Sequence, residues 1–566
     1  MNPTVKRLTL LTLLTLMTAY LGSCSNDAPS TDVEIVETLT EDAANELIEF
    51  SDALRKRNFA EAGTYLSARF QGKGYGIDTN KGERVETLSL DVTRRHRTVA
   101  EATPFVDKAA FLEDLESLLA PFESIDRVFF KTRGAEFDTD GKLGHLKLTT
   151  EIIGRAAKGS MRAVYGWAKG EVVREGDKWL LSKFEMERYQ ITTRPRPIFT
   201  DVTETTGLSH RAPRLGSPGN DKFYWRGAAC ADVNGDGLYD IFSSAPDRNF
   251  LYINRGNGKF EDTAAAAGLS QPIGPTSPLF FDYDNDGDKD LFLGFVGWED
   301  DGAPGGDALH FFENDGNGNF VDASKKLGLS GIRCCAFSAL AADFDNDGWL
   351  DLYICAYNRL DTDYPDSWHD AKNGNPNLLL RNLKGKGFAD HTASFGVAGT
   401  AWSYAAAAAD FDEDGDQDIY VANDYGKNSL YVNQGDGRFV DKAAEMGVLD
   451  TGNGMGVAWG DMNNDGKLDI YVSNMSSSAG NRILRRLAGE GKDKKGGDVV
   501  QTLFKLAAGN TVFLRDGDGF KRLPPEAGGI SASWAWGASL LDIDLDGRLD
   551  VYVANGFISG KSLKDT

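Results

Sequence analysis

The chain has 566 residues, of which 41% are hydrophobic and 26% are charged, and this length is enough for two or more folded domains. Its 61 Lys and Arg residues against 85 Asp and Glu residues give a net charge of −24, which repels nucleic acid and anionic lipid and argues against both as partners. The 64 glycines require many tight turns, more than a helical bundle uses.

Residues 1–23 have the pattern of an export signal. Two basic residues precede an apolar stretch that is too short for a membrane span. Leu21-Gly22-Ser23-Cys24 then resembles the lipobox of bacterial lipoproteins, in which the Cys is acylated after cleavage. This resemblance predicts lipidation of Cys24, a polar tether over residues 24–35, and a location at the bacterial outer membrane or cell surface, otherwise in the periplasm. The lipid would be the only contact with the membrane; the alternative is an ordinary secretory peptide.

Four further cysteines would lie in an oxidising compartment, where disulfides are permitted. They are Cys230, Cys334, Cys335 and Cys355. The adjacent Cys334 and Cys335 allow a vicinal disulfide, and buried thiols on strands are the alternative. The sequence leaves the disulfide state open.

Residues 36–195 predict a small α+β domain. Leu47, Phe50 and Leu54 fall on one helix face, and alternating strand patterns and a hairpin turn at residues 175–178 follow later. Helices followed by such a sheet resemble the ketosteroid-isomerase-like cone fold, which often holds a pocket. Candidate pocket residues are His96, His145, Glu151, Tyr165 and Trp167. They form no catalytic motif, so no catalytic residue is assigned.

After a boundary at the prolines of residues 194–197, the rest of the chain, residues 197–566, contains six copies of the pattern Asp-x-Asp/Asn-x-Asp-Gly-x-x-Asp. The side chains at positions one, three, five and nine of the copies are the candidate metal ligands. They are Asp232, Asn234, Asp236 and Asp240; Asp282, Asp284, Asp286 and Asp290; Asp343, Asp345, Asp347 and Asp351; Asp410, Asp412, Asp414 and Asp418; Asp461, Asn463, Asp465 and Asp469; and Asp542, Asp544, Asp546 and Asp550.

These loops offer only oxygen ligands, which suit a hard cation and disfavour zinc or copper. The Gly at position six permits the backbone reversal that turns the oxygens inward. The pattern therefore predicts about six calcium sites, with magnesium as the alternative metal.

The loops are not EF-hands, because an EF-hand needs a Glu at position twelve and flanking helices. Position twelve is occupied by Ser243, Leu293, Ile354, Val421, Val472 and Val553. The residues that follow position nine, such as Ile-Tyr-Val after Asp418, have the composition of strands. Each loop is therefore predicted to connect two strands of a sheet.

A second motif, Leu-Tyr-x-Asn-x-Gly-x-Gly-x-Phe-x-Asp, follows the loops and predicts a hairpin, with a Gly six residues after its last Asp. An isolated copy of this last part, Asp201 to Gly207, precedes the first loop. A trailing unit moved to the front of an array is what closure of a ring of sheets requires. The fifth repeat departs from the pattern, with Arg522 in place of the trailing Asp.

Three segments carry a family resemblance: Phe199 to Leu208, Ala422 to Gly426, and Gly454 to Asp461. They resemble the FG-GAP/VCBS repeats of the cartilage acidic protein family, which share the propeller of integrin α-subunit heads. The resemblance implies a mainly β fold, a calcium-binding β-propeller preceded by the α+β domain. Seven blades are favoured, and six are the alternative.

The leading functional hypothesis is an exported binding or adhesion module of the cell envelope, with a protein or glycan as its ligand. Insertions at residues 298–307, 357–377 and 482–508 are candidate ligand loops. Tyr364, Trp368 and His369 could stack on a sugar, or pack within their own loop. The alternatives are an envelope enzyme or small-molecule binder that uses a pocket in the α+β domain, and a structural envelope component. The ligand and the oligomeric state stay open.

Overall fold

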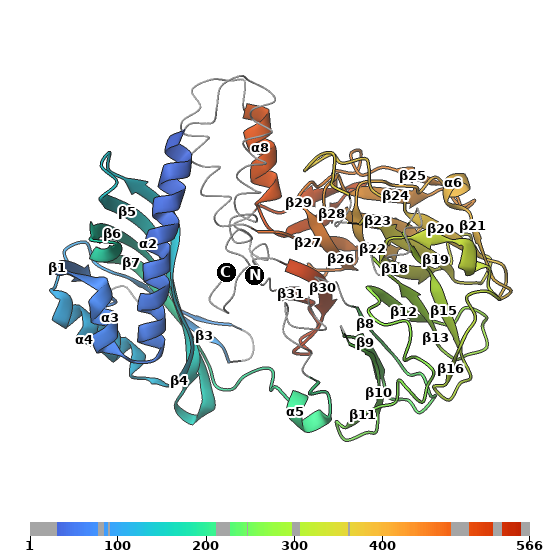
Figure 1. The fold of residues 1–566 in the computed structure, drawn as a ribbon, viewed down its shortest axis with the longest axis horizontal. Helices are drawn as coiled ribbons and strands as arrows, with labels where there is room; N and C mark the ends of the chain where they lie inside the picture. Colours follow the sequence, from blue (N-terminus) through green and yellow to red (C-terminus); the bar gives the residue numbers. More distant parts are fainter. Residues whose placement is uncertain are drawn as a thin grey trace. The chain divides into compact units, whose positions relative to one another are not determined.

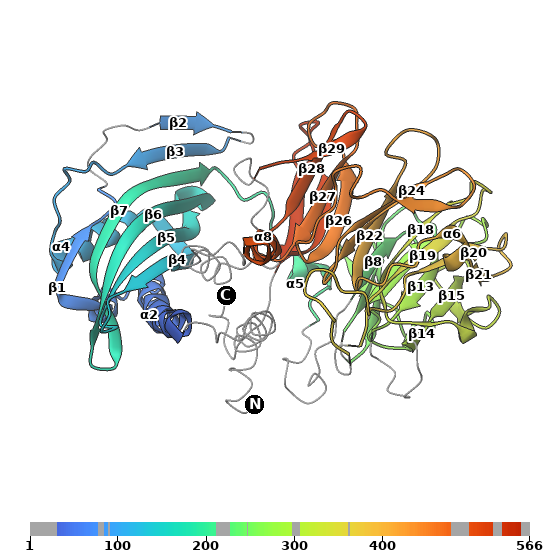
Figure 2. The same cartoon turned by 90° about the horizontal axis from the view of Figure 1, so that it is seen from above.

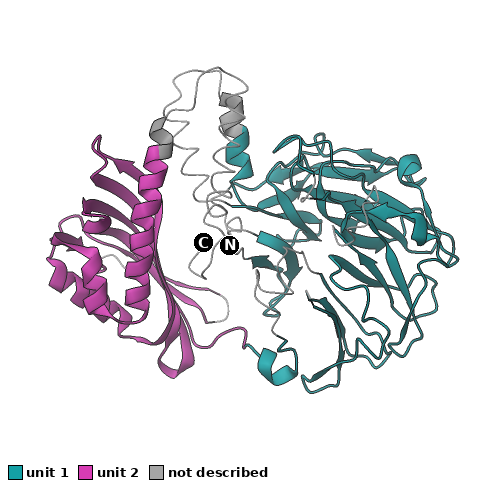
Figure 3. Cartoon of the chain, in the orientation of Figure 1, with its two compact units in different colours: residues 1, 201–477, 495–557 teal, residues 2–200, 478–494, 558–566 magenta. Residues whose placement is uncertain are grey.

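The computed structural model describes residues 31–76, 84–88, 91–210, 227–245, 247–296, 306–359, 363–476, 497–524 and 535–555. The predicted signal peptide and Cys24 lie outside these residues. The chain divides into two compact units, one built on residues 2–200 and the other on residues 201–477 and 495–557 (Figure 3). None of the helices in the described ranges is long and apolar enough to cross a membrane.

The first unit has helices on one face of a curved sheet, so it is α+β as predicted (Figures 1 and 2). The helices are α2 (Thr31–Arg55), α3 (Phe59–Ala62), η1 (Gly63–Tyr65), α4 (Lys108–Leu119) and η2 (Ala157–Gly159). The strands are β1 (Leu66–Lys73), β2 (Arg84–Thr87), β3 (Thr93–Thr98), β4 (Phe122–Phe137), β5 (Leu143–Ala156), β6 (Ser160–Glu175) and β7 (Lys178–Arg194). Their order is β2-β3-β7-β6-β5-β4, with β1 parallel to β7. Helix α2 begins at Thr31, inside the segment predicted as a tether.

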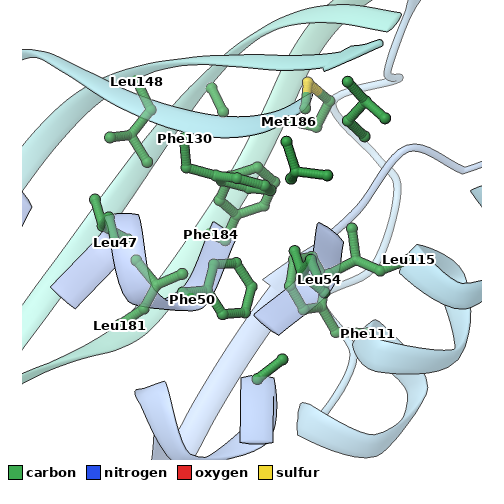
Figure 4. Close-up of a cluster of buried hydrophobic side chains, with 14 of the residues drawn as sticks. Leu47, Phe50, Leu54, Phe111, Leu115, Phe130, Leu148, Leu181, Phe184 and Met186 are labelled. Carbon is green, nitrogen blue, oxygen red and sulfur yellow. The ribbon is translucent and has the colours of Figure 1, made fainter. Parts of the chain in front are cut away.

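An apolar core joins the helices to the sheet (Figure 4). Leu47, Phe50 and Leu54 of α2 are all buried in it, as their helical spacing predicts. The ring of Phe184 on β7 packs 5.3 Å from Phe111 of α4 and 5.7 Å from Phe130 of β4, measured between centroids. These large side chains fill the space between the helices and the sheet.

The second unit contains five four-stranded antiparallel sheets and two two-stranded sheets among its described residues. The four-stranded sheets are β8 (Ala228–Ala231), β9 (Asp240–Ser244), β10 (Asn249–Asn254) and β11 (Phe260–Asp262); β12 (Ser277–Phe281), β13 (Asp290–Gly294), β15 (His310–Asn314) and β16 (Phe320–Asp322); β18 (Ala336–Ala342), β19 (Asp351–Ala356), β20 (Leu378–Asn382) and β21 (Phe388–Asp390); β22 (Ser403–Ala409), β23 (Asp418–Asn423), β24 (Ser429–Asn433) and β25 (Phe439–Asp441); and β26 (Gly454–Gly460), β27 (Asp469–Asn474), β28 (Thr511–Asp516) and β29 (Gly519–Arg522). One two-stranded sheet is β30 (Ala535–Leu541) with β31 (Asp550–Asn555), and the other is the short pair β14 (Asp307–Ala308) and β17 (Arg333–Cys334). The helices of this unit are α5 (Thr203–Thr206), η3 (Leu329–Gly331), α6 (Thr392–Phe395) and α8 (Gly497–Leu506).

The first strands of these sheets lie beside one another in chain order, from β8 through β12, β18, β22 and β26 to β30. Apolar side chains fill the space between neighbouring sheets; for example, Phe242 and Leu251 of the first sheet pack with Leu293 of the second. This radial stack is a β-propeller, as the repeats predict. The described residues form six of its sheets, and a seventh blade stays a prediction.

Residues 201–207, the copy that precedes the first loop, lie against the first sheet. Each Asp-to-Gly turn that ends a repeat lies in the same way against the sheet of the next repeat. Gly207, at the end of α5, has a φ of 92°, and a Cβ there would come within 2.6 Å of the carbonyl oxygen of Phe260. Gly268, in the first trailing turn, would come within 2.5 Å of the Phe320 carbonyl oxygen on the second sheet. The displaced unit therefore has the position on the first sheet that the closed-ring hypothesis predicts.

The four cysteines Cys230, Cys334, Cys335 and Cys355 are present as thiols rather than disulfides. Cys334, Cys335 and Cys355 are buried. Burial raises the pKa of the Cys355 thiol to about 12, so this group is a poor nucleophile. Cys334 on β17 and Cys355 on β19 are thus buried thiols on strands, one of the two alternatives, whereas Cys230 is exposed.

Candidate metal centre

The six acidic loops all connect the first strand of a sheet to its second strand. Residues 232–240 join β8 to β9, and the loops that start at residues 282, 343, 410, 461 and 542 have the same place in the other sheets. Because the loops share one junction, they all lie at the same end of their sheets.

The glycine at position six of every loop has a left-handed backbone conformation. Its φ ranges from 82° at Gly547 to 98° at Gly287. A residue with a Cβ is strained there, whereas glycine is not. These glycines allow the tight reversal that brings the carboxylates of a loop together.

The carboxylate at position one closes the loop by accepting backbone amides. Asp343 accepts the amides of Asp347 at 3.0 Å and Gly348 at 2.8 Å, and Asp410, Asp461 and Asp542 accept the amides at the same two positions of their own loops. Position five in turn accepts the amide at position seven, as Asp236 accepts that of Leu238 at 2.9 Å. The loop fold is therefore encoded largely by its own carboxylates.

The carboxylate at position nine ties the loop to the sheet. Asp240 accepts the amide of Val233 from its own loop at 3.0 Å and the amide of Asn254 from the third strand at 2.7 Å. The same pair of bonds recurs at Asp290, Asp351, Asp418 and Asp469. Burial raises the pKa of Asp290, Asp351 and Asp418 to about 7, and neighbouring carboxylates add to the effect.

The oxygen atoms of these side chains fit a calcium ion. Carboxylate oxygens of positions one, three and nine lie within 4.8 Å of one another in the second, fourth and sixth loops, and those of positions one, three and five do so in the third. Among the described residues, one buried oxygen of each of Asp282, Asp284, Asp345 and Asp544 has no hydrogen-bond partner. Buried acceptors without donors and an all-oxygen set are what a hard cation satisfies.

Several loops are also linked to the next loop through position four. The side-chain amide of Asn285 donates to the carbonyl of Gly348 at 3.0 Å, and that of Asn464 donates to the carbonyl of Gly547 at 3.1 Å. Asn346 likewise donates to Asp416 at 2.5 Å. These bonds join the second, third and fourth loops in one series and the fifth and sixth in another.

The candidate pocket residues of the α+β unit do not line an interior, so that prediction is wrong. On β5 and β6 the even-numbered residues, including Leu148 and Val164, enter the core, and His145, Glu151, Tyr165 and Trp167 therefore point to the opposite face. His96 and Tyr165 both pair with Gln190, which places them on that same face. There His96 contacts Glu86 at 3.1 Å, and Trp167 packs against Tyr165.

The insertion at residues 357–377 is mostly described. The ring of Trp368 packs against that of Tyr425, with centroids 5.4 Å apart. This side chain therefore packs within the propeller, which is the structural alternative to stacking on a sugar. Tyr364 is 76% exposed. Most of the insertions at residues 298–307 and 482–508 lies outside the described residues.

Two sets of residues near the loops were not found from the sequence. One is the strand-end residue that donates its amide to position nine, which is Asn in four repeats; its recurrence in the Leu-Tyr-x-Asn motif was an available signal. The other is Arg381 on β20, whose guanidinium contacts Asp345 and Asp347 of the third loop. Nothing in the sequence marks Arg381, because it lies far from that loop along the chain.

Comparisons with known proteins agree with the repeat architecture. The FG-GAP-like repeat family matches residues 232–293, 295–354 and 410–472. Over 76 residues the chain is 43% identical to cartilage acidic protein 1 of Mus musculus, covering 13% of this chain and 12% of that protein. It is 36% identical over 107 residues to the Xenopus tropicalis protein, covering 19% of this chain and 16% of the relative. The chain thus spans a small part of the length of these relatives.

Solved structures are similar at a lower level. A lectin of Agrocybe aegerita, described as recognising non-reducing terminal N-acetylglucosamine, has 15% identity and a TM-score of 0.30, and the match covers 73% of this chain and 85% of the lectin. The protein LinA has 12% identity and a TM-score of 0.21 and covers 29% of this chain and 97% of its own. Scores this low do not establish a shared fold.

The recurrent loops, the sheets that they join, the matched repeats and the local identity to cartilage acidic protein 1 lead to one conclusion: the second unit contains FG-GAP-like repeats.

Proposed function

We propose that this protein is a calcium-binding propeller that acts as a binding or adhesion module, exported and anchored by a lipid on Cys24. The observation that carries the proposal is the recurrence of the same acidic loop at one end of six propeller sheets, with buried carboxylate oxygens in the second, third and sixth loops that have no donor among the described residues. Such a set of oxygens is satisfied by Ca²⁺, which would be held by positions one, three, five and nine of the loops.

Calcium would act on stability rather than touch the ligand. Each sheet is antiparallel, and its strands follow one another in chain order, so the first connection and the second connection of a sheet lie at opposite ends. The acidic loops are first connections. The long insertions, including residues 357–377, are second connections. Ligand contacts are therefore assigned to the insertion end, and calcium to the other.

Binding rather than catalysis is proposed because the interior of the α+β unit is filled by its own side chains, among them Phe111, Phe130 and Phe184. The ligand class is a protein or a glycan of the cell envelope. Tyr364 is the candidate contact, because it is a large, exposed aromatic side chain on the longest insertion that the structure describes.

A matched pair of variants tests the assignment of the two ends. Tyr364 at the insertion end is 76% exposed, and Tyr239 in the first acidic loop is 73% exposed. The full chain, Tyr364→Ala and Tyr239→Ala are applied to a glycan array and to a panel of purified envelope proteins, with calcium and with chelator. We expect chelator to abolish ligand binding and Tyr364→Ala to weaken it. Tyr239→Ala should leave ligand binding unchanged. Binding that ignores both chelator and Tyr364→Ala contradicts the proposal.

A further inference from the structure

One position on the third strand of the sheets differs in charge from repeat to repeat. It is the residue just before the one whose backbone amide binds the position-nine carboxylate. In each four-stranded sheet, the residue whose amide binds the position-nine carboxylate is the last or next-to-last residue of the third strand, as Asn382 binds Asp351 at 2.7 Å. The residue immediately before the donor is, in order along the chain, Ile253, Glu313, Arg381, Val432 and Leu514. Only the third repeat has a cation there, and only the second has an acid.

Arg381 reaches into the third loop. Its Nε donates to Asp345 Oδ2, and its Nη2 donates to Asp347 Oδ2 at 3.1 Å. These carboxylates are positions three and five of the loop, and their side chains are only 13% and 15% exposed. The guanidinium therefore binds the same two groups through which the other loops would hold a metal ion, and it does so with the directed geometry of a charge-assisted pair.

The second loop has the opposite arrangement. Glu313 lies at the position equivalent to Arg381 and accepts from the hydroxyl of Tyr283 and from Lys326. Asp288 adds a further carboxylate at position seven. One buried oxygen of each of Asp282, Asp284 and Asp288 has no donor among the described residues. In the second loop the cation Lys326 pairs with Glu313 rather than with a candidate metal ligand. In the third loop Arg381 pairs with two candidate ligands, although one oxygen of Asp345 also has no donor among the described residues.

We infer that Arg381 is the built-in cation of the third loop, which folds without calcium, and that calcium occupies the second loop. This inference rests on the proposed calcium-binding function. A guanidinium bound to two ligand carboxylates leaves no room for a divalent ion a few ångströms away, because like charges at that separation repel strongly in a partly buried site. Calcium could enter the third loop only after Arg381 had left Asp345 and Asp347.

The test compares the same substitution in two loops of the full chain. Asp284→Ala and Asp345→Ala each remove the position-three oxygen ligands, one from the second loop and one from the third. Bound calcium per chain is measured by equilibrium dialysis with elemental analysis. The inference expects Asp284→Ala to lose one calcium ion and Asp345→Ala to lose none. A third variant, Arg381→Gln, is expected to gain one calcium ion and to melt at a lower temperature than the wild type in chelator.

Arg438→Gln is the control, because Arg438 pairs with Asp436 on the surface of a hairpin and touches no acidic loop; its calcium count should equal that of the wild type. Loss of one calcium ion from Asp345→Ala, with calcium bound to the wild type, would overturn the inference and leave the proposed function standing. No calcium on the wild type at millimolar concentration would overturn both. Because the Asp345→Ala result decides the inference, it stays testable even if Arg381→Gln fails to fold.

Discussion

The backbone amide of Asn433, at the end of β24, donates a 2.8 Å hydrogen bond to the buried carboxylate of Asp418. Asp418 also accepts the amide of Phe411 from its own loop, at 3.4 Å. The last acid of each loop therefore has a structural role that does not depend on metal, in addition to the role expected of a ligand.

This relationship predicts that replacing two different acids of one loop changes the free energy of unfolding differently in chelator. Asp418→Ala leaves two buried amides without an acceptor and should lower the free energy of unfolding by about 1–3 kcal/mol per amide, with or without calcium. Asp412→Ala, at the exposed position three, should lower it only when calcium is present. Urea unfolding of both variants in calcium and in chelator measures the difference. Equal behaviour of the two variants in chelator would refute the division of roles.

A second prediction concerns the end of the sheets away from the loops. Burial raises the pKa of Asp424 to about 6, although the Tyr357 hydroxyl at 2.5 Å and Asn453 both donate to it. Since the folded pKa exceeds the unfolded value of about 3.9, the folded state holds the extra proton between these values. The contribution of Asp424 to stability is therefore fully present below pH 4 and is lost as the pH rises through about 6.

Tyr357→Phe removes a donor that the ionised carboxylate needs more than the neutral one. The variant should lose about 1–3 kcal/mol of stability at pH 7.5 and less at pH 5. The measurement is the difference in urea unfolding free energy between variant and wild type, in saturating calcium at each pH, so that titration of other groups cancels. The same loss at both values would mean that Asp424 is not ionised in the folded protein.

A third prediction follows from the departure in the fifth repeat. Arg522, which replaces the trailing Asp, donates to Asp450 at 3.2 Å and to Thr511 at 2.8 Å. The side chain of Asp450 is fully buried, so Arg522→Ala leaves a buried carboxylate with fewer donors and should cost about 1–3 kcal/mol. Thermal unfolding measures the loss. Arg438→Ala, which breaks an exposed pair, should have no measurable effect, and a similar loss in both variants would show that the burial of Asp450 does not matter.

The sequence predicted the repeats well because their signals are local. The carboxylates, the glycine and the exit strand of a loop are consecutive, so the turn and the strand after it could both be predicted. Contacts between distant segments could not. Arg381 meets Asp345 only because β20 lies beside β19, and the chain between the loop and β20 differs in length from repeat to repeat.

Burial was also beyond the reach of a local pattern. Residues 418–423 and residues 550–555 have nearly the same sequence, Asp-Ile-Tyr-Val-Ala-Asn and Asp-Val-Tyr-Val-Ala-Asn. Tyr420 is fully buried between neighbouring strands, but Tyr552 is 54% exposed. The reason is the number of strands: among the described residues β31 pairs with β30 alone, whereas β23 lies inside a four-stranded sheet. A similar limit applied to Tyr165 and Trp167, whose strand was predicted but not the face to which they point.

The central claim is that calcium stabilises the propeller, and thermal unfolding of the full chain with and without metal tests it most directly. Extracellular calcium modules bind at about 10⁻⁴–10⁻³ M, and a tenfold excess over Kd stabilises a protein by roughly 1.4 kcal/mol per site. At about 10 mM calcium, several filled sites together should raise the melting temperature by about 10 °C or more over that in chelator. Melting curves that coincide in calcium and in chelator would contradict the account.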